Sequence, residues 1–306
     1  MGIRDIIGAA VKAIPTIDGH HHIWRLQDLA WLSGPQVPRI FGPYKPICRD
    51  YSIEEFRSDV ASSNVIKSIY VQTNWPAEQS YDEALWVQSV ANATGWPHAN
   101  VVHADLSDPD VGELLARLAK LPLTRGVRQQ LHWHVNPQYS FAPRPDVMND
   151  AQWRRGLSQL AQHNLLFELQ IFASQMADGA KLARAFPDTT FVLEHAGMLE
   201  DVSAEGWQRW RRGMRALADC RNVNVKLSGI GTFDHAYQFE VVAPIIKETV
   251  STFGAERCLY GSNFPIEKLW TDYATLYQTF RRAIDQLSES EQAQILSGTA
   301  ARLYRI

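Results

Sequence analysis

The chain has few cysteines, almost no net charge and no long apolar run. Its three cysteines (Cys48, Cys220 and Cys258) include no close pair, which excludes a disulfide framework and a cysteine-based zinc site and favours a reducing cytoplasm. A net charge of -3 gives no electrostatic reason to bind nucleic acid or a membrane surface. No segment approaches a membrane span, and Asp5 beside the short apolar stretch 6–11 argues against a cleaved signal. We therefore expect a cytoplasmic protein that acts on a small molecule. A homodimer is compatible with the sequence, which does not determine the oligomeric state.

Two signatures of common enzyme classes are also missing. The first apolar run lacks the glycine-rich phosphate turn of dinucleotide-binding folds, and the chain contains no Gly-x-Ser-x-Gly elbow. Apolar residues, in contrast, make up 45% of the 306 residues, enough for a large core. Ten tryptophans and ten tyrosines, Trp24 among them, either pack the bases of loops or line a deep pocket for a small organic ligand.

Apolar runs of strand length recur along the chain, and each is followed by a longer helical pattern. Such alternation predicts parallel strands joined by helical crossovers. A closed (β/α)₈ barrel (TIM barrel) forming a single domain over 1–306 is the economical arrangement at this length. A doubly wound open sheet is the alternative. The eight predicted strands are 16–22, 65–72, 99–106, 125–130, 165–171, 190–195, 223–228 and 258–263.

Two long irregular segments interrupt this alternation. The segment 27–50 is rich in proline, and 132–150 contains three prolines. Each follows the carboxyl end of a predicted strand, where barrel enzymes carry their active-site loops. We predict that both are lids or specificity loops, with plain surface elaboration as the alternative.

The most informative motif is a histidine triplet at the end of the first predicted strand, in the string Asp18-Gly19-His20-His21-His22. Alternation along a strand places His20 and His22 on one face and His21 on the other. His21 then has a structural role. His20 and His22, together with His195, are neutral nitrogen donors suited to one divalent metal ion such as zinc or manganese.

Polar residues also end the other predicted strands, where a barrel gathers its catalytic groups. Buried without partners they would be costly, so we expect them to contact metal, substrate or one another. Arg128 suits a substrate carboxylate or carbonyl, with a structural ion pair as the alternative. Lys226 contacts substrate or forms an ion pair inside the barrel. Asp105 or Glu168 could orient the imidazoles. Further polar strand ends are Gln72, Asn74, His103, Gln130, Gln170, Glu194, Ser228, Ser262 and Asn263.

The string Asp18–Trp24 resembles the opening motif of the amidohydrolase-2 family of TIM-barrel hydrolases, nearest to its sugar-lactonase and 2-pyrone-4,6-dicarboxylate lactonase group. Further matches follow in the family's order and span the whole chain. They are Gly126–Arg128, Leu169–Gln170, Leu193–Gly197, Lys226–Gly229, Gly261–Pro265 and Ala300–Tyr304.

The resemblance implies hydrolysis of a lactone or a related small carboxylated compound, with the histidines of strands one and six around the reacting carbonyl. His20, His22, His195 and Asn263 then form the catalytic group, and Trp24, His103, Arg128, Gln170 and Lys226 bind substrate. The resemblance leaves metal use open, because some members of the family need zinc and others work without it.

One position departs from the family pattern. Where the family carries Gly-Ser-Asp-Trp-Pro, with the aspartate as base, this chain has Asn263. An amide cannot act as a general base, although it can orient water or ligate a metal weakly. The base is then Asp105, Glu194, Asp234, Glu267 or a metal-bound hydroxide. Alternatively the chemistry differs, as in the decarboxylases of the wider group, or the barrel binds a small acid without turnover.

Overall fold

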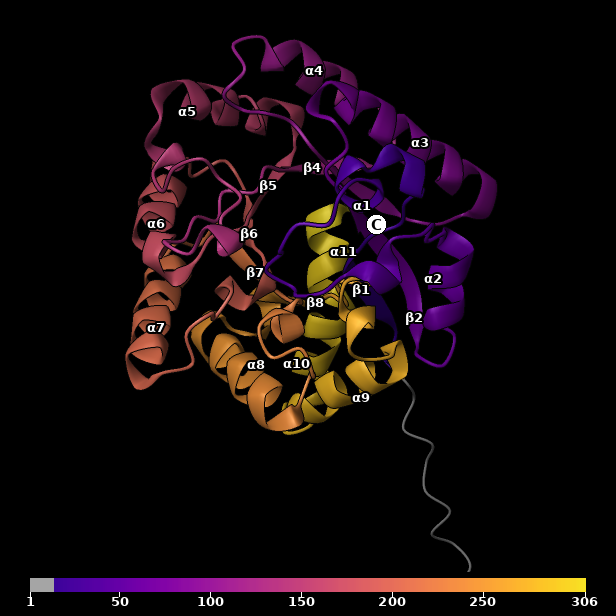
Figure 1. Ribbon diagram of the computed structural model, residues 1–306. Coiled ribbons are helices and arrows are strands. Elements are labelled where there is room, and N and C mark those ends of the chain that lie inside the picture. Colours follow the sequence, from indigo (N-terminus) through magenta and orange to yellow (C-terminus); the bar gives the residue numbers. More distant parts are fainter. Residues whose placement is uncertain (1–13) are drawn as a thin grey trace, which may run out of the picture.

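The computed structural model describes residues 14–306, so the apolar stretch 6–11 lies outside the described residues. Eight strands pair in parallel and in sequence order, each with the next, and the helices other than α11 lie outside them (Figure 1). The structure confirms the predicted single-domain (β/α)₈ barrel. The strands are β1 Thr16–His21, β2 Val65–Val71, β3 Ala99–Val102, β4 Thr124–Arg128, β5 Leu166–Leu169, β6 Phe191–Leu193, β7 Val223–Leu227 and β8 Cys258–Tyr260.

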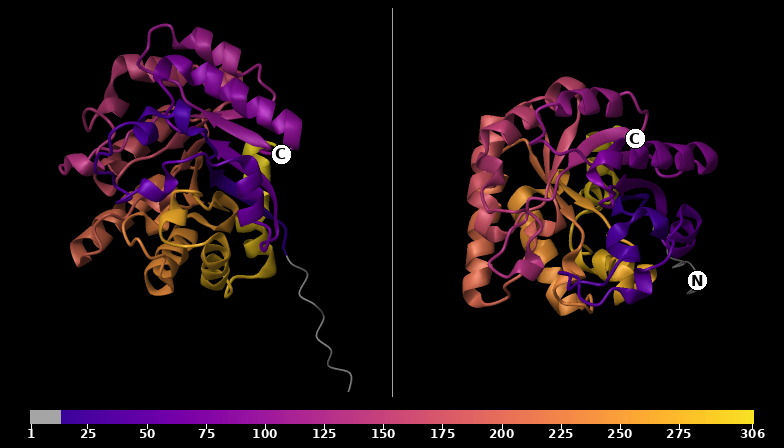
Figure 2. Two further views of the ribbon diagram at one scale, coloured as in Figure 1. Left: turned by 45° about the vertical axis from the view of Figure 1, so that its right-hand side comes forward. Right: turned by 45° about the horizontal axis from the view of Figure 1, so that its top comes forward.

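The helices form the outer layer of the barrel (Figure 2). Apart from those of α11, their buried residues face the strands and form one extended apolar core with the outer strand faces. Within residues 14–306, no helix combines the length and the apolarity needed to cross a membrane. The helices are α1 Ala30–Ser33, α2 Ile53–Asp59, α3 Ser80–Thr94, α4 Val111–Leu118, α5 Ala151–Ser158, α6 Met176–Ala185, α7 Ala204–Ala218, α8 Phe239–Phe253, α9 Tyr273–Ala283, α10 Glu289–Ala293 and α11 Thr299–Tyr304.

The two ends of the barrel differ. Leu303 and Tyr304 of α11 pack with Ile17, Leu166 and other residues of the barrel interior in a separate apolar cluster, and Figure 1 shows α11 through the ring of strands. Arg125, near the start of β4, donates to the Tyr304 carbonyl, and Arg302 donates to the carbonyl of Glu256 just before β8, so α11 covers the amino-terminal end. Among residues 14–306, this leaves the carboxyl end of the barrel for a ligand, as in other barrels of this class.

The barrel closes where the histidine triplet meets the segment after β8. His21 and Phe264 form a parallel bridge, and the His22 N–H donates to the Phe264 carbonyl at 2.7 Å. The Asn263 N–H donates to the His20 carbonyl, also at 2.7 Å. The two most informative sequence motifs, far apart in the chain, thus share one seam.

The regular strands are shorter than several predicted runs. β6 ends at Leu193 and β8 at Tyr260, before the polar residues that follow them. His195 and Asn263 have φ values of +55° and +60°, in the left-handed region that side-chain-bearing residues seldom adopt. The chain thus leaves the ladder at these positions, and the site is built on the strand ends and the first turns after them.

Candidate active site

A bulge in β1 turns its histidines into the barrel. Asp18 is aligned with Ser68 of β2 and His21 with Tyr70, so three steps along β1 match two along β2. Ile17 belongs to the interior cluster, and strict alternation from it would send His20 and His22 outward. The extra residue reverses this. The prediction that His20 and His22 share a face agrees with their rings, whose centroids lie 5.0 Å apart.

His21 points the other way, toward the helical layer. Its ring stacks on Phe56 of α2 with a centroid distance of 3.9 Å, and burial lowers its pKa to about 3. The neutral ring is part of the packing. Gly19 is required beside it, because a Cβ there would lie 2.6 Å from the Tyr260 carbonyl oxygen of β8.

Hydrogen bonds hold two of the site imidazoles at one ring nitrogen each. His22 Nδ1 lies 2.7 Å from the Val71 carbonyl oxygen, so Nδ1 carries the proton and Nε2 keeps its lone pair. His195 Nδ1 lies 3.0 Å from Ser228 Oγ. Burial, then Arg128, lowers the pKa of both rings, to about 3 for His195. Both are neutral imidazoles at neutral pH.

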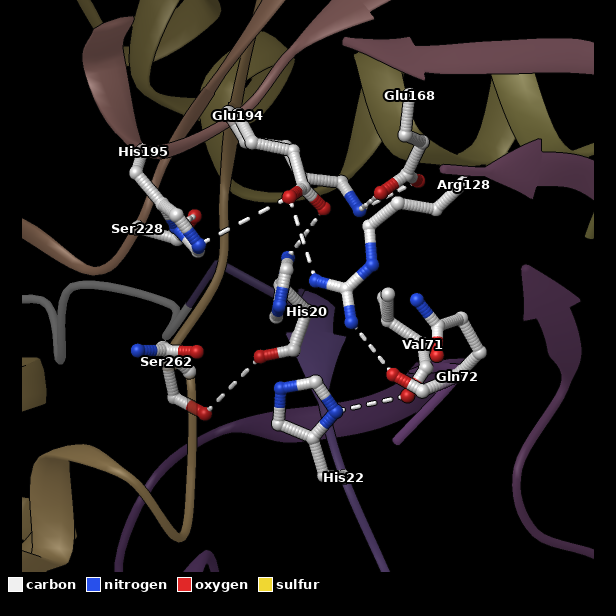
Figure 3. A network of polar contacts seen from close by, with 12 residues as sticks. His20, His22, Val71, Gln72, Arg128, Glu168, Glu194, His195, Ser228 and Ser262 are labelled. Carbon is white, nitrogen blue, oxygen red and sulfur yellow. Dashed lines mark hydrogen bonds and ion pairs between the residues drawn. The ribbon is translucent and has the colours of Figure 1, made fainter. Parts of the chain in front are cut away.

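Glu194 connects the charged and neutral groups of the site (Figure 3). Its Oε1 lies 3.3 Å from His20 Nδ1, and its Oε2 lies 3.3 Å from Arg128 Nη1 and 3.9 Å from His195 Nε2. We expected Asp105 or Glu168 to orient the imidazoles. Glu194, which the sequence suggested only as a base, lies against them instead.

Asp105 and Glu168 have other partners. Asp105 Oδ1 accepts a hydrogen bond from Gln129 Nε2 at 2.8 Å. Glu168 accepts from Lys226 Nζ at 2.6 Å through both carboxylate oxygens, and Tyr304 of α11 donates its hydroxyl to the same carboxylate. Neither carboxylate is placed to orient a site imidazole.

The structure does not bring two of the predicted substrate contacts to the site. Lys226 is fully buried in its ion pair with Glu168, between the site and α11, so its ammonium has no free face for substrate. His103 lies outside the cavity, with Nδ1 2.8 Å from Ser80 Oγ of α3. The interior ion pair, considered as the alternative for Lys226, is what the structure contains.

A cavity of about 530 Å³ opens at the carboxyl end of the strands. Its floor consists of strand-end residues. The loops 27–50 and 132–150 both contribute to its walls, as expected of specificity loops, and several predicted aromatic residues line it. The lining residues are His22, Trp24, Ala30, Trp31, Arg39, Ile40, Phe41, Gln72, Thr73, Asn74, Trp75, Pro76, Arg128, Gln130, His132, Gln138, Ser140, Phe141, Gln170, His195, Met198, Thr232, Asn263 and Ile266.

Most of the predicted site residues therefore meet in one place. Those that line the cavity are Trp24, His22, Arg128, Gln170, His195 and Asn263. His20 is fully buried directly behind them, with its ring 4.8 Å from that of His195. Sequence reasoning missed His132, Met198 and Thr232. Only His132 carried a usable signal, because it opens the predicted loop 132–150.

The residue that departs from the family pattern has an acidic neighbour. Asn263 Nδ2 donates to Glu267 Oε1 at 3.4 Å, and Trp270 Nε1 donates to Glu267 Oε2 at 3.0 Å. Glu267 is fully buried, and burial raises its pKa to about 8. The carboxylates considered as bases do not reach the cavity lining within the described residues. They are Asp105, Glu194, Asp234 and Glu267.

A metal ion fits one part of this arrangement. Ligand atoms of His20, Glu194 and His195 lie within 4.8 Å of one another. Within residues 14–306, His20 Nε2 is buried without a hydrogen-bond partner, and His20 Nδ1 and Glu194 Oε1 have only their 3.3 Å contact with each other, which does not have hydrogen-bond geometry. Such burial is costly unless something else satisfies these atoms. Two imidazoles and a carboxylate suit zinc or manganese. Glu194 takes the place that the sequence analysis gave to His22 in the predicted metal group.

Comparison with known proteins agrees with this fold. Residues 17–306 match the family model described as Amidohydrolase, and the chain belongs to this family of TIM-barrel hydrolases. It is 34% identical to the uncharacterized protein y4mH of Sinorhizobium fredii, over 96% of this chain and 99% of that protein. It is 25% identical to an L-fucono-1,5-lactonase of Burkholderia ambifaria, over 95% of each chain.

A solved structure shares the fold at lower identity. An amidohydrolase of Burkholderia multivorans with bound zinc superimposes with a TM-score of 0.80 at 24% identity, covering 95% of this chain and 99% of that one. The family membership makes the protein a hydrolase, and the similarity to this structure supports the barrel fold.

Proposed function

We propose that the protein opens the ring ester of a small lactone by adding water to its carbonyl. The observation that carries this proposal is the convergence of two neutral imidazoles, an amide and a guanidinium on one cavity floor, contributed by His22, His195, Asn263 and Arg128. The 25% identical L-fucono-1,5-lactonase supports the same reaction class.

Arg128 binds the carbonyl oxygen in this reaction. Its Nη1 faces Glu194 and its Nη2 donates to the Gln72 carbonyl oxygen at 2.5 Å, so the guanidinium is held in one orientation. Its Nε is buried without a partner, yet the side chain lines the cavity. A fixed cation beside the carbonyl stabilises the negative charge that develops on oxygen during attack.

His22 accepts the proton of the attacking water. Its Nε2 has a free lone pair because Nδ1 is committed to Val71, and it lies outside the group that suits a metal. Asn263 presents an amide that orients the water. As the water oxygen bonds to the carbonyl carbon, the bond from that carbon to the ring oxygen breaks. The ring oxygen takes up the proton, and the product is a hydroxy acid.

A divalent ion held by His20, Glu194 and His195 would polarise the carbonyl and lower the pKa of nearby water. These residues also act without it. His195 borders the cavity, and Glu194 keeps Arg128 and His20 in place.

The test is turnover of a panel of sugar lactones and carboxylated lactones, with and without added Zn²⁺ or Mn²⁺, followed by proton release. We expect at least one lactone to be opened, and we expect His195→Ala to lose about 10²-fold or more of kcat/KM. The control is His98→Gln, which alters a histidine outside the cavity. Three outcomes contradict the proposal: no turnover across the panel, carbon dioxide release without ring opening, or tight binding of a small acid without turnover.

A further inference from the structure

The cavity carries positive charge and no acidic side chain. Among the described residues that line it, Arg39 and Arg128 are cationic, and none is aspartate or glutamate. The charge of Arg128 is balanced from behind by Glu194. Arg39 forms no ion pair within residues 14–306. Its charge is left for a ligand to balance.

Arg39 is held at the cavity wall by both long loops. Its guanidinium lies 5.7 Å from the ring centroid of Trp31, whose Nε1 donates to the Thr73 carbonyl at 2.9 Å. The Arg39 carbonyl accepts a hydrogen bond from Gln138 Nε2 of the loop 132–150 at 3.0 Å. An arginine that only solvates the surface does not require contacts of this kind from two loops. Here these contacts hold one cation at the lining of the cavity.

Within residues 14–306, the Arg39 guanidinium also donates no hydrogen bond to a protein group. Arg39 is half-buried, and its Nε is buried without an acceptor. An unsatisfied donor on a charged group is costly, and a planar guanidinium matches a carboxylate through two parallel hydrogen bonds. One unpaired cation corresponds to one such group, and Phe41 and Phe141, which line the same cavity, suit an apolar or planar ligand body.

We propose that Arg39 binds a carboxylate of the substrate, at the wall of the cavity away from the ring bond that opens. The substrate class is a lactone with a free carboxylate on a largely apolar ring. This inference rests on the proposed lactone hydrolysis for the reaction itself, but the anion subsite does not.

Binding and turnover are measured separately to test this. Calorimetric titration with benzoate and with benzamide compares an anion with its uncharged analogue on the wild type, Arg39→Gln and Arg39→Lys. We expect Arg39→Gln to weaken benzoate about tenfold or more, to leave benzamide within about twofold, and Arg39→Lys to lie between. The matched control is Arg57→Gln, which removes another arginine stacked on a tryptophan, Trp96, but outside the cavity.

The kinetic arm uses one carboxylated lactone and its primary amide. For Arg39→Gln we expect KM for the carboxylate to rise about tenfold or more with kcat nearly unchanged, and the amide to be processed as by the wild type. Equal affinity of wild type and Arg39→Gln for benzoate overturns the subsite, whatever the turnover. Equal losses for the acid and its amide also overturn it, because they show a structural defect. Selective loss of benzoate binding without turnover of any lactone supports the subsite and counts against lactone hydrolysis alone.

Discussion

The side-chain amide of Asn263 donates its Nδ2 hydrogen to the carboxyl of Glu267 across 3.4 Å. This contact turns the amide oxygen away from Glu267, and Asn263 lines the cavity. An acceptor oxygen is thus available where the family pattern has an aspartate. The carboxyl group that contacts this amide belongs to Glu267, four residues later in the chain, and Glu267 does not line the cavity.

The contact between Asn263 and Glu267 predicts that the substitution Asn263→Asp, which restores the family's aspartate, does not increase the activity. Glu267 already holds its proton up to about pH 8, so in Asn263→Asp the two neighbouring carboxyl groups share this proton and the new aspartate is not a free base. We expect its kcat to fall about tenfold or more, and the double variant Asn263→Asp/Glu267→Gln to recover much of the loss. Full pH–rate profiles of both variants and of Glu267→Gln measure this. An Asn263→Asp variant as fast as the wild type would show that Glu267 does not influence this position.

Glu267 also predicts how stability depends on pH. Burial raises its pKa from 4.5 to about 8. Between these values the folded state holds a proton that the unfolded state has released, so this contribution to stability is complete below pH 4.5 and is lost as pH rises toward 8. We expect wild type to lose up to about 1.4 kcal/mol per pH unit relative to Glu267→Gln in that window.

Urea unfolding of both proteins at pH 5, 6.5 and 8 measures this difference. The control is Glu54→Gln, which alters an exposed carboxylate at the start of α2. If the wild type and Glu267→Gln change in parallel over this range, Glu267 is ionised in the folded protein.

The buried ligand atoms of His20, Glu194 and His195 predict a bound divalent ion. We expect elemental analysis of protein purified without a histidine tag to find about one zinc or manganese per chain. We expect His20→Ala and Glu194→Gln to lower this content and His103→Gln to leave it unchanged, because His103 lies outside the ligand group. The prediction is wrong if elemental analysis finds no metal and the activity is unchanged by a chelator. These residues would then form a metal-independent site.

The buried pair of Lys226 and Glu168 predicts a large stability effect that is not specific to catalysis. Lys226→Met leaves the Glu168 carboxylate uncompensated beneath the site, which costs about 3–5 kcal/mol of unfolding free energy. The double variant Lys226→Met/Glu168→Met removes both charges, and we expect it to regain most of that loss. Chemical denaturation of the three proteins measures the difference. If Lys226→Met is as stable as the wild type but has a raised KM, Lys226 binds substrate instead.

Much of the barrel could be predicted because its signals are local. Parallel strands buried on both faces appear as apolar runs, and the helices between them carry their own periodicity. The position of a polar residue at a strand end was enough to place His22, Arg128, Gln170, His195 and Asn263 at one end of the barrel, since all strand ends of a parallel barrel point the same way.

The rest depended on distances that no local pattern contains. The bulge in β1 is visible only against β2, and it decides which face of the strand carries His20 and His22. Lys226 and Arg128 are both strand-end cations in the sequence. One is neutralised inside the barrel by Glu168, while the other borders the cavity with Glu194 behind it.

The sequence by itself determined the number and order of the strands, the end of the barrel that carries the site, and the histidines and the amide that build it. Only the tertiary structure decided which carboxylate serves which partner. In the folded protein, Glu194 contacts His20 and Arg128, and Glu267 contacts Asn263. Arg39 has no anionic partner within residues 14–306. The physical reason is that periodicity reports burial, which is a property of each segment, whereas charge pairing depends on a few ångströms between segments that lie far apart in the chain.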